Sequence, residues 1–196
     1  QLGFRTGGKV LKLINDDIQY LCLPLCHTLA INIAWPATLL HGGTIALARE
    51  FSPETFWDDI KKYRATLWIY RGEMCRRLFN RPAEETDSRN TLRYMSGAGL
   101  RAGYWTEFKK RFGIEKIIET YILSEGPGML FNLKGVPGMT GRVSDSTGKP
   151  GVLVKYNSEK KEIVRSADGL AVKCRAGESG LYLASCGKYD PFPGYK

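Results

Sequence analysis

The sequence has no long hydrophobic run. None of its apolar stretches approaches the roughly 20 residues that a membrane-spanning helix requires. Residues 1–12 contain no apolar core of the kind found in signal peptides. The chain starts with glutamine rather than methionine, and its last residues, "PFPGYK", complete no structural element. We therefore expect a piece of a longer cytoplasmic protein.

Cysteine and histidine are sparse, which bears on disulfides and metal sites. An odd number of scattered cysteines is typical of reduced thiols rather than of a disulfide framework. The five are Cys22, Cys26, Cys75, Cys174 and Cys186. Cys22, Cys26 and His27 lie close together, but zinc requires four ligands and no second Cys/His pair has ligand spacing. The pattern favours buried thiols in the core over a metal site.

Two common phosphate-binding motifs are also missing. The sequence contains no G-x-x-x-x-G-K-[ST] loop and no G-x-G-x-x-G dinucleotide fingerprint. The stretch "GAGLRAG" offers the first two glycines of the fingerprint, but it lies at the wrong end of a βαβ unit. A nucleotide site would therefore have to be of another type.

The chain is basic, with 29 Lys and Arg against 20 Asp and Glu, for a net charge of +9. Such an excess favours phosphate-bearing ligands, nucleic acids or anionic lipid surfaces. The charges are dispersed over the polar faces of expected helices, and no arginine-rich arm or aromatic-stacking motif accompanies them. We expect no nucleic acid among the partners. A nucleic-acid binder would lose affinity steeply with added salt.

Apolar runs of strand length alternate with amphipathic stretches of helix length over the first two thirds of the chain. This alternation predicts an α/β fold with a mainly parallel sheet flanked by helices. The expected strands are 18–24, 44–48, 66–70, 92–96 and 115–123, and the expected helices are 29–43, 52–64, 72–80 and 102–113. For the second helix, Ser52 is the expected N-cap and Pro53 the first helical residue.

The pattern changes after about residue 135. Residues 136–151 are rich in Gly, Pro and Ser and have no helical periodicity. Four short β-type segments follow, joined by hairpin-type connections. They are 152–156, 162–166, 170–174 and 180–184. We predict a small antiparallel β unit at the C-terminal end.

Two glycine-containing loops follow strands of the predicted sheet: "SGAGL" at 96–100 and "SEGPG" at 124–128. In parallel sheets, ligands bind outside the carboxyl ends of the strands. Glycines let a backbone approach a ligand closely, and a Ser hydroxyl beside a Glu carboxylate can hold a phosphate and its magnesium ion. The alternative interpretation is a polar strand end that is simply solvated by water.

Four stretches in this order carry a resemblance to a known family. They are "LPLCHT", "REFSPETFWDDIKKYRATLWIYRGEMCRRLFNRP", "GAGLRAGYWTEFKKRFGIEKIIETY" and "ADGLAVKCRAGESG". Together they resemble the adenylate-forming (AMP-binding) acyl-CoA synthetases, and within them the very-long-chain acyl-CoA synthetase and fatty-acid transport protein branch. The resemblance covers roughly residues 16–195 and implies the centre of a longer enzyme.

The resemblance implies how the parent enzyme is divided. Residues 1–135 would be the α/β part of the AMP-binding large domain, and residues 136–196 a truncated β-rich part of the same domain. The upstream phosphate loop, the downstream ribose-binding Asp and the C-terminal domain with its catalytic Lys would lie outside the chain.

The resemblance also assigns site residues. "YILSEG" stands where the family has Tyr-Gly-x-Thr-Glu-Gly. Tyr121 would stack on adenine, Ser124 would meet the α-phosphate, and Glu125 would bind Mg²⁺, which makes Ser124 and Glu125 the catalytic pair. The remaining nucleotide-binding residues would form the adenine wall: Gly97, Ala98, Gly99 and Leu100. His27 would lie in the acyl pocket.

The sequence departs from the family at Ile122 and Leu123, where a Gly and a small residue are expected. A branched side chain in that space should push into the acyl or adenylate pocket. Two interpretations follow: the acyl pocket, with Ile122 in it, takes an altered acyl group, or this protein binds nucleotide poorly.

The function implied by the resemblance is that of an ATP-dependent long-chain or very-long-chain fatty acid–CoA ligase. The fatty acid attacks ATP to give an acyl-adenylate, and CoA then displaces AMP. The implied cofactors are ATP and Mg²⁺, with CoA as co-substrate. The implied setting is cytoplasmic, with peripheral contact with a membrane. The alternative is a catalytically inactive lipid- or partner-binding module derived from the same fold.

Overall fold

The computed structural model describes residues 6–122, 129–143 and 151–184. The predictions for Leu123, Ser124 and Glu125 concern residues outside these ranges. The chain divides into two compact units, the first made of residues 1–121 with 131–141 and the second of 122–130 with 142–196. The predicted boundary at residue 135 concerns the parent enzyme and stays a prediction.

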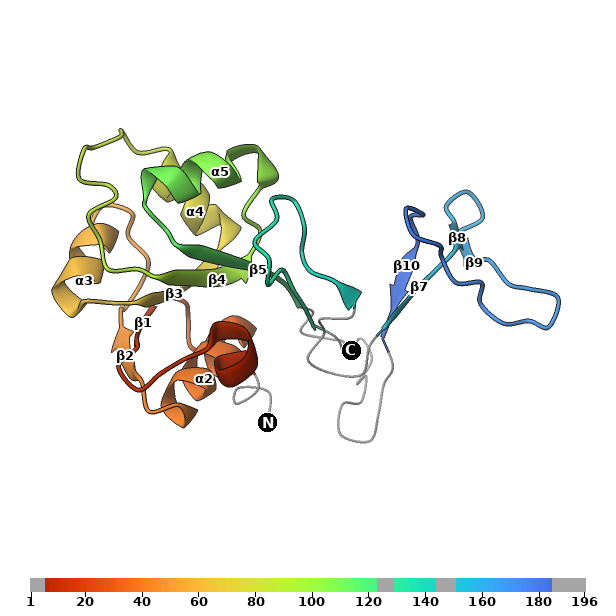
Figure 1. Ribbon diagram of the computed structural model, residues 1–196, viewed down its shortest axis with the longest axis horizontal. Coiled ribbons are helices and arrows are strands. Elements are labelled where there is room, and N and C mark those ends of the chain that lie inside the picture. Colours follow the sequence, from red (N-terminus) through yellow and green to blue (C-terminus); the bar gives the residue numbers. More distant parts are fainter. Residues whose placement is uncertain (1–5, 123–128, 144–150, 185–196) are drawn as a thin grey trace. The chain divides into compact units, whose positions relative to one another are not determined.

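The main feature is a six-stranded sheet with the strand order β2-β1-β3-β4-β5-β6 (Figure 1). Its strands are β1 (Ile18–Leu21), β2 (Thr44–Leu47), β3 (Leu67–Arg71), β4 (Tyr94–Ala98), β5 (Lys116–Ile122) and β6 (Met129–Phe131). The pairs β1–β2, β1–β3, β3–β4 and β4–β5 are all parallel. The predicted mainly parallel α/β sheet is confirmed.

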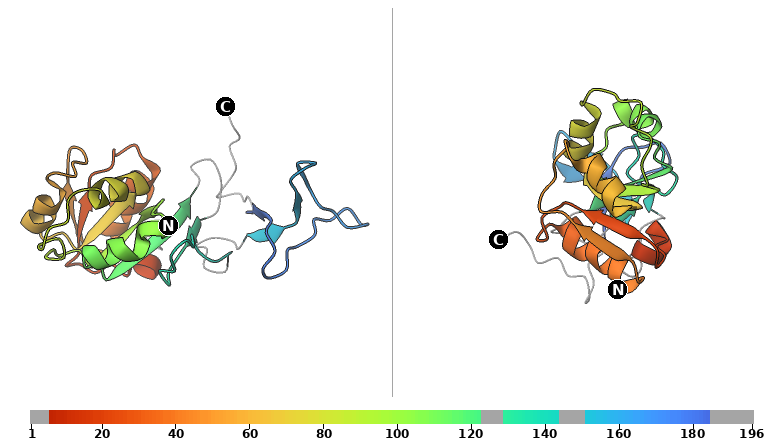
Figure 2. Two further views of the ribbon diagram at one scale, coloured as in Figure 1. Left: turned by 90° about the horizontal axis from the view of Figure 1, so that it is seen from above. Right: turned by 90° about the vertical axis from the view of Figure 1, so that its left-hand side faces the viewer.

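Helices cover both faces of this sheet. In the described residues, one π-helix precedes the first strand, η1 (Thr6–Leu11). One further π-helix and four α-helices connect the strands: η2 (Leu29–Ala34), α2 (Trp35–Leu40), α3 (Phe56–Tyr63), α4 (Gly72–Phe79) and α5 (Ala102–Arg111). In Figures 1 and 2, η1 and α2 lie on one face, and α4 and α5 lie on the other. This arrangement lets consecutive strand residues point into two separate apolar layers.

Aromatic residues fill the layer beneath α3, α4 and α5. Phe56 and Trp68 have ring centroids 4.5 Å apart, and Phe108 and Phe112 have centroids 4.7 Å apart. Trp68 and Tyr70, two residues apart on β3, both point into this layer and are almost fully buried. Burial of rings of this size makes a large share of a domain's hydrophobic stabilisation.

The start of α3 differs from the prediction. The helix begins at Phe56 with Thr55 as its N-cap, while residues 53–55 form a turn. The hydroxyl of Ser52 accepts a hydrogen bond from the Thr55 N–H at 3.3 Å, so it caps this turn and not the helix itself. The Ser-Pro signal marked the right region but placed the first helical residue three positions early.

The strand β4 also differs in extent. It runs from Tyr94 to Ala98, so Gly97 and Ala98 belong to the strand and the connecting segment starts at Gly99, which has a positive φ. The reason is its neighbour β3, since Tyr70 and Arg71 pair with Gly97 and Ala98. Interstrand hydrogen bonds thus extend a strand that local propensity would have ended at the first glycine.

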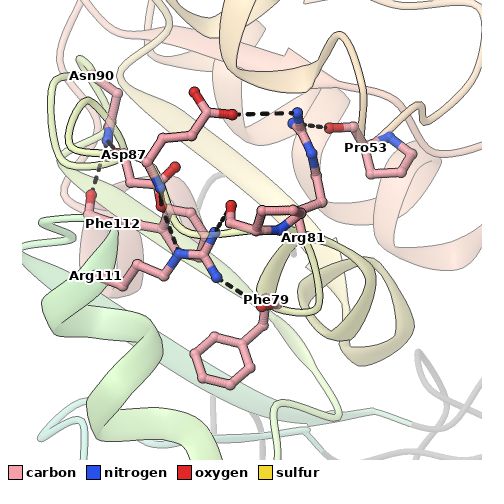
Figure 3. Close-up of polar contacts among 9 residues, drawn as sticks. Pro53, Phe79, Arg81, Asp87, Asn90, Arg111 and Phe112 are labelled. Carbon is pink, nitrogen blue, oxygen red and sulfur yellow. Dashed lines mark hydrogen bonds and ion pairs between the residues drawn. The ribbon is translucent and has the colours of Figure 1, made fainter.

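Arg111 ties the polar loop 81–90 to the helical layer (Figure 3). Its guanidinium donates to the Asp87 carboxylate at 2.6 Å and to the carbonyl oxygens of Phe79 and Pro82 at 2.7 and 2.9 Å. The Arg111 and Asp87 side chains are only 16% and 11% exposed. A single half-buried cation therefore satisfies acceptors at the end of α4 and at two positions of the loop.

The second unit contains two small antiparallel sheets. β7 (Val152–Val154) pairs with β10 (Leu181–Leu183), and β8 (Tyr156–Asn157) pairs with β9 (Glu162–Ile163). The predicted segment 170–174 forms only isolated antiparallel bridges, through Ala171 and Lys173. The expected antiparallel β unit is confirmed, with shorter strands than the sequence pattern predicted.

The cysteines only partly follow the expectation of core thiols. Cys22 and Cys75 are buried, whereas Cys26 is exposed and Cys174 is half-buried. Burial raises the pKa of the Cys22 thiol to about 11, so this thiol stays protonated at neutral pH. Of the helices in the described ranges, none has the length and apolar content to cross a membrane.

Candidate active site at the carboxyl edge of the sheet

Parallel pairing brings three strand ends of the first unit to one edge of the sheet. β3 ends at Arg71 and β4 ends at Ala98, directly paired with each other. β1 is the other neighbour of β3, and the loop that follows it carries His27. The carboxyl ends of neighbouring parallel strands form the usual ligand edge of an α/β sheet.

Glycines at this edge allow an unusually close backbone packing. A Cβ on Gly97 would lie 2.1 Å from the Tyr70 carbonyl oxygen, and a Cβ on Gly72 would lie 1.9 Å from the Gly99 carbonyl oxygen. Gly99 has a φ of +99°, a conformation that side chains rarely adopt. The glycine loop predicted from the sequence is therefore required by the packing of β3, β4 and α4.

A buried carboxylate on β5 accepts hydrogen bonds from the backbone of this loop. Glu119 on β5 is 4% exposed and accepts hydrogen bonds from the Tyr70 hydroxyl at 2.5 Å, from the Leu100 N–H at 3.3 Å, and from the Gly99 N–H. Burial raises the pKa of Glu119, while these three donors oppose that rise. Glu119 thereby fixes the backbone of the two residues that follow β4.

A shallow pocket with a volume of about 210 Å³ opens beside the loop. Its lining comes from the ends of β3 and β4 and the first turns of α4 and α5: Arg71, Gly72, Glu73, Arg76, Ala98, Gly99, Arg101 and Tyr104. Three arginines stand against one glutamate, and that glutamate is held by Arg76 at 2.7 and 2.9 Å. The pocket therefore has a positive balance suited to an anionic ligand.

His27 lies at the same edge, next to Arg71. Its Nε2 is 2.7 Å from Nη1 of Arg71, and its Nδ1 accepts from the Leu29 N–H at 3.1 Å. Burial and the neighbouring guanidinium lower the pKa of His27. The structure thus links the residue predicted for the acyl pocket to an arginine of the pocket that Ala98 and Gly99 line.

The other predicted site residues are placed only in part. Tyr121 and Ile122 are the last two residues of β5, and both are half-buried. Ser124 and Glu125 lie outside the described residues, so the assignment of Mg²⁺ to Glu125 stays a prediction. The described ranges contain no group of three or more His, Cys, Asp or Glu side chains that could hold a metal ion.

Three residues of the site were missed at the level of sequence: Tyr70, Arg71 and Glu119. Each had a signal. Glu119 is a charge within a buried apolar strand, and such a group needs partners. Arg71 directly follows the apolar run 67–70, at the strand end where a ligand edge was expected.

The opposite edge of the sheet also carries a polar cluster, but its contacts are internal. Asp17 is 1% exposed and accepts hydrogen bonds from the Thr66 hydroxyl at 2.8 Å and the Ile14 N–H at 3.0 Å, and it pairs with Arg93. These bonds join the segments that enter β1, β3 and β4. The cluster stabilises the fold, and it leaves the carboxyl edge as the candidate site.

Comparison with protein-family models matches residues 3–168 to the family described as AMP-binding enzyme. The chain belongs to this family. The match covers most of the sequence, including β3, β4 and residues 124–128, and it agrees with the resemblance seen in the motifs.

Curated relatives of the chain are fatty-acid enzymes and transport proteins. It is 38% identical to the medium/long-chain-fatty-acid–CoA ligase FadD6 of Mycobacterium tuberculosis, over 96% of this chain and 31% of that protein. It is 39% identical to human long-chain fatty acid transport protein 1, over 96% of this chain and 30% of that protein. The chain thus spans about a third of the length of these relatives.

Solved structures show the same fold. The ATP-bound MatB from Rhodopseudomonas palustris superimposes with a TM-score of 0.64 and 25% identity, covering 82% of this chain and 32% of MatB. A fatty acyl CoA synthetase of Mycobacterium tuberculosis reaches a TM-score of 0.66 at 18% identity, over 87% of this chain and 32% of that one. The predicted family and fold are both confirmed.

Proposed function

We propose that the chain is the central part of an ATP-dependent fatty acid–CoA ligase acting on long-chain or very-long-chain acids. The observation that carries this proposal is the glycine edge at residues 97–100, where the backbones of β3, β4 and α4 pack closely at Gly72 and Gly97, and Glu119 accepts from the Gly99 N–H. The family match and the names of the ligase and transport-protein relatives support it. They give no support to the alternative of an inactive binding module.

The edge fits an adenine nucleotide. Gly97, Ala98, Gly99 and Leu100 would form one wall for adenine, and Tyr121 would stack against the base. This wall carries little side-chain bulk: a Cβ on Gly97 would meet the backbone of Tyr70, and Gly99 has a positive φ that favours glycine. The positive balance of the adjoining pocket supports an anionic substrate.

Ser124 and Glu125 would act at the phosphate end. Ser124 would donate a hydrogen bond to the α-phosphate and Glu125 would hold Mg²⁺. The ion, when bound, offsets charge that develops on the phosphate during attack by the fatty acid. His27 would lie with the acyl group, and Ile122 would restrict the acyl pocket.

The test uses the full-length protein that contains this chain. Pyrophosphate release with ATP and fatty acids of graded length should depend on both substrates, and acyl-CoA should form when CoA is added. Glu125→Ala should abolish adenylation of every acid, whereas Glu115→Ala, which removes an exposed carboxylate just before β5, should keep near-normal rates. Near-normal rates in Glu125→Ala would exclude that residue as the metal ligand.

The same assay tests the acyl pocket. Ile122→Gly should raise activity on long-chain acids by about tenfold to a hundredfold, because overfilling a packed site costs typically about 1–3 kcal/mol. A neutral result at every chain length would mean that Ile122 points away from the acyl group. The 196-residue chain alone should show no ligase activity, since it spans only about a third of the length of its ligase and transport-protein relatives.

Location and membrane contact belong to the same proposal. A cytoplasmic enzyme with peripheral contact with a membrane would meet fatty acids at the bilayer surface. Co-sedimentation of the full-length protein with vesicles containing anionic lipid tests that contact, and it should weaken as salt is added if the basic charge of the chain drives it.

A further inference from the structure

The segment that joins β4 to α5 has the position of a typical anion site. It follows a parallel strand, begins with Gly99 at a positive φ, and leads through Leu100 and Arg101 into α5. Backbone N–H groups at such a place ordinarily point at a phosphate, and the helix dipole favours negative charge there. A ligand can use these N–H groups only if the protein leaves them free.

Two of these N–H groups donate to a side chain of the protein itself. The Gly99 N–H donates to Oε1 of Glu119, and the Leu100 N–H donates to Oε2 of the same carboxylate at 3.3 Å. Oε2 also accepts from the Tyr70 hydroxyl at 2.5 Å. Glu119 is 4% exposed, so water competes little for these bonds. An internal carboxylate thus takes the donors that a phosphate would use.

The register of three neighbouring strands places this carboxylate. Gly97 on β4 pairs with Tyr70 on β3 and with Glu119 on β5. A Cβ on Gly97 would lie 2.7 Å from Cγ of Tyr70. Because Gly97 has no side chain, the Tyr70 hydroxyl can reach across β4 to the Glu119 carboxylate.

Glu119 also decides which kind of group the segment can accept. Both of its oxygens receive N–H donors, which suits the ionised form, because an ionised carboxylate only accepts hydrogen bonds. A phosphate on this segment would find the donors occupied and a like charge within hydrogen-bond distance of them. An uncharged planar group meets neither obstacle.

We propose that Glu119 is a positioning residue which, through Gly99 and Leu100, makes this segment bind the uncharged base of the nucleotide and reject its phosphates. The inference rests on the proposed ligase function. It assigns the orientation of ATP at the glycine edge to a buried residue that acts through its neighbours.

The test compares the two ends of the nucleotide in the full-length protein that contains this chain. Glu119→Gln keeps the size of the side chain, but its amide has one acceptor oxygen and turns an NH₂ donor toward a backbone N–H. Calorimetric titration should show adenosine binding weakened by about tenfold or more, because charge-assisted hydrogen bonds that hold the segment are lost. Inorganic pyrophosphate should bind at least as tightly as before, since the like charge is gone.

Tyr70→Phe is the second variant, because it removes one donor to Glu119 and leaves the carboxylate in place. It should weaken adenosine binding by a smaller factor, about threefold. The matched control is Thr38→Val in α2, which removes a buried hydrogen bond from the Thr38 hydroxyl to the Ala34 carbonyl oxygen at 2.8 Å. That variant should leave both affinities within about twofold of the unaltered protein.

Steady-state kinetics separate a positioning role from a general loss of structure. Glu119→Gln should raise KM for ATP by about tenfold and leave KM for the fatty acid within about twofold. Equal weakening of adenosine and pyrophosphate binding by Glu119→Gln would overturn the inference, and so would unchanged adenosine binding. Weaker binding of pyrophosphate alone would overturn it by assigning the segment to the phosphates.

If Glu119→Gln does not fold, Tyr70→Phe decides, and unchanged adenosine affinity in that variant overturns the inference. The proposed function fails separately, if the unaltered protein makes no acyl-CoA from any acid. The adenosine titrations then still decide the role of Glu119. An unaltered protein that binds neither adenosine nor ATP contradicts both proposals.

Discussion

The two compact units of the chain differ in how their strands are stabilised. In the first unit, four of the five residues of β3 are buried, since helices cover both faces of the sheet. In the second unit, β7 has one buried residue and β10 has none, and Leu170 is 66% exposed. Two-stranded sheets are marginal in water on their own. Most of the stabilising burial of strand residues therefore lies in the α/β layer that carries the candidate site.

The largest expected effect is on hydrogen exchange. Amides of Ile69 and Ile118 should exchange at least about a thousandfold more slowly than amides of β8 and β9, because core strands open only with the whole domain while short exposed hairpins open locally. Exchange followed by mass spectrometry or NMR on the 196-residue chain measures this ratio. Equal protection in the two units would contradict the comparison.

Deleting a core side chain should have the next largest effect. Phe108→Ala should lower the free energy of unfolding by about 3–5 kcal/mol, since the ring is fully buried and leaves a cavity. The matched change Leu170→Ala in the second unit should stay within about 0.5 kcal/mol, because that side chain is largely exposed. Urea unfolding monitored by tryptophan fluorescence distinguishes the two outcomes, and similar losses would remove the difference between the units.

Ion pairs offer a third contrast. Arg111→Met should cost about 2–3 kcal/mol of stability, because it leaves the half-buried Asp87 carboxylate and two carbonyl oxygens without their donor. Lys155→Met should change stability by less than about 0.5 kcal/mol, since its pair with Glu178 is over a third exposed on both sides. Urea midpoints measured at low and high salt check both values. A cost at Lys155 equal to that at Arg111 would contradict the prediction.

The smallest expected effect is a pH dependence within the first unit. The pKa of His27 is lowered from 6.5 in the fold, so the unfolded chain takes up a proton at a higher pH than the folded chain does. Stability should be complete above pH 6.5 and decline slightly as the pH falls through the folded pKa. The decline should shrink in His27→Gln and in Arg71→Met. Urea midpoints at pH 7.5 and 5.5 measure it, and equal slopes in all three proteins would exclude His27 as the cause.

Most of the fold could be predicted from the sequence, because the hydrophobic periodicity that distinguishes helices from strands is visible within short segments. The alternation of strand and helix patterns predicted the parallel sheet, and the short segments after residue 151 predicted the antiparallel unit. Errors arose at element ends. Ser52 and Pro53 marked a turn before α3, and Gly97 and Ala98 remained in β4 because β3 pairs with them.

The sequence predicted single residues of the candidate site but not the contacts between them. The glycine loop could be located in the sequence, because Gly97 and Gly99 directly follow the apolar strand pattern of residues 92–96. The support of that loop by Glu119 could not, since it depends on which neighbour β5 has and in what register. A residue 20 positions away in sequence becomes a contact only through strand order.

The sequence by itself determined the class of fold, the family resemblance and the identity of the residues available at the carboxyl edge. Only the tertiary structure decided that Arg71 contacts His27, across 44 positions of the sequence. That contact arises because β1 and β3 are adjacent and parallel, and strand adjacency is set by the burial of both sheet faces rather than by any local pattern.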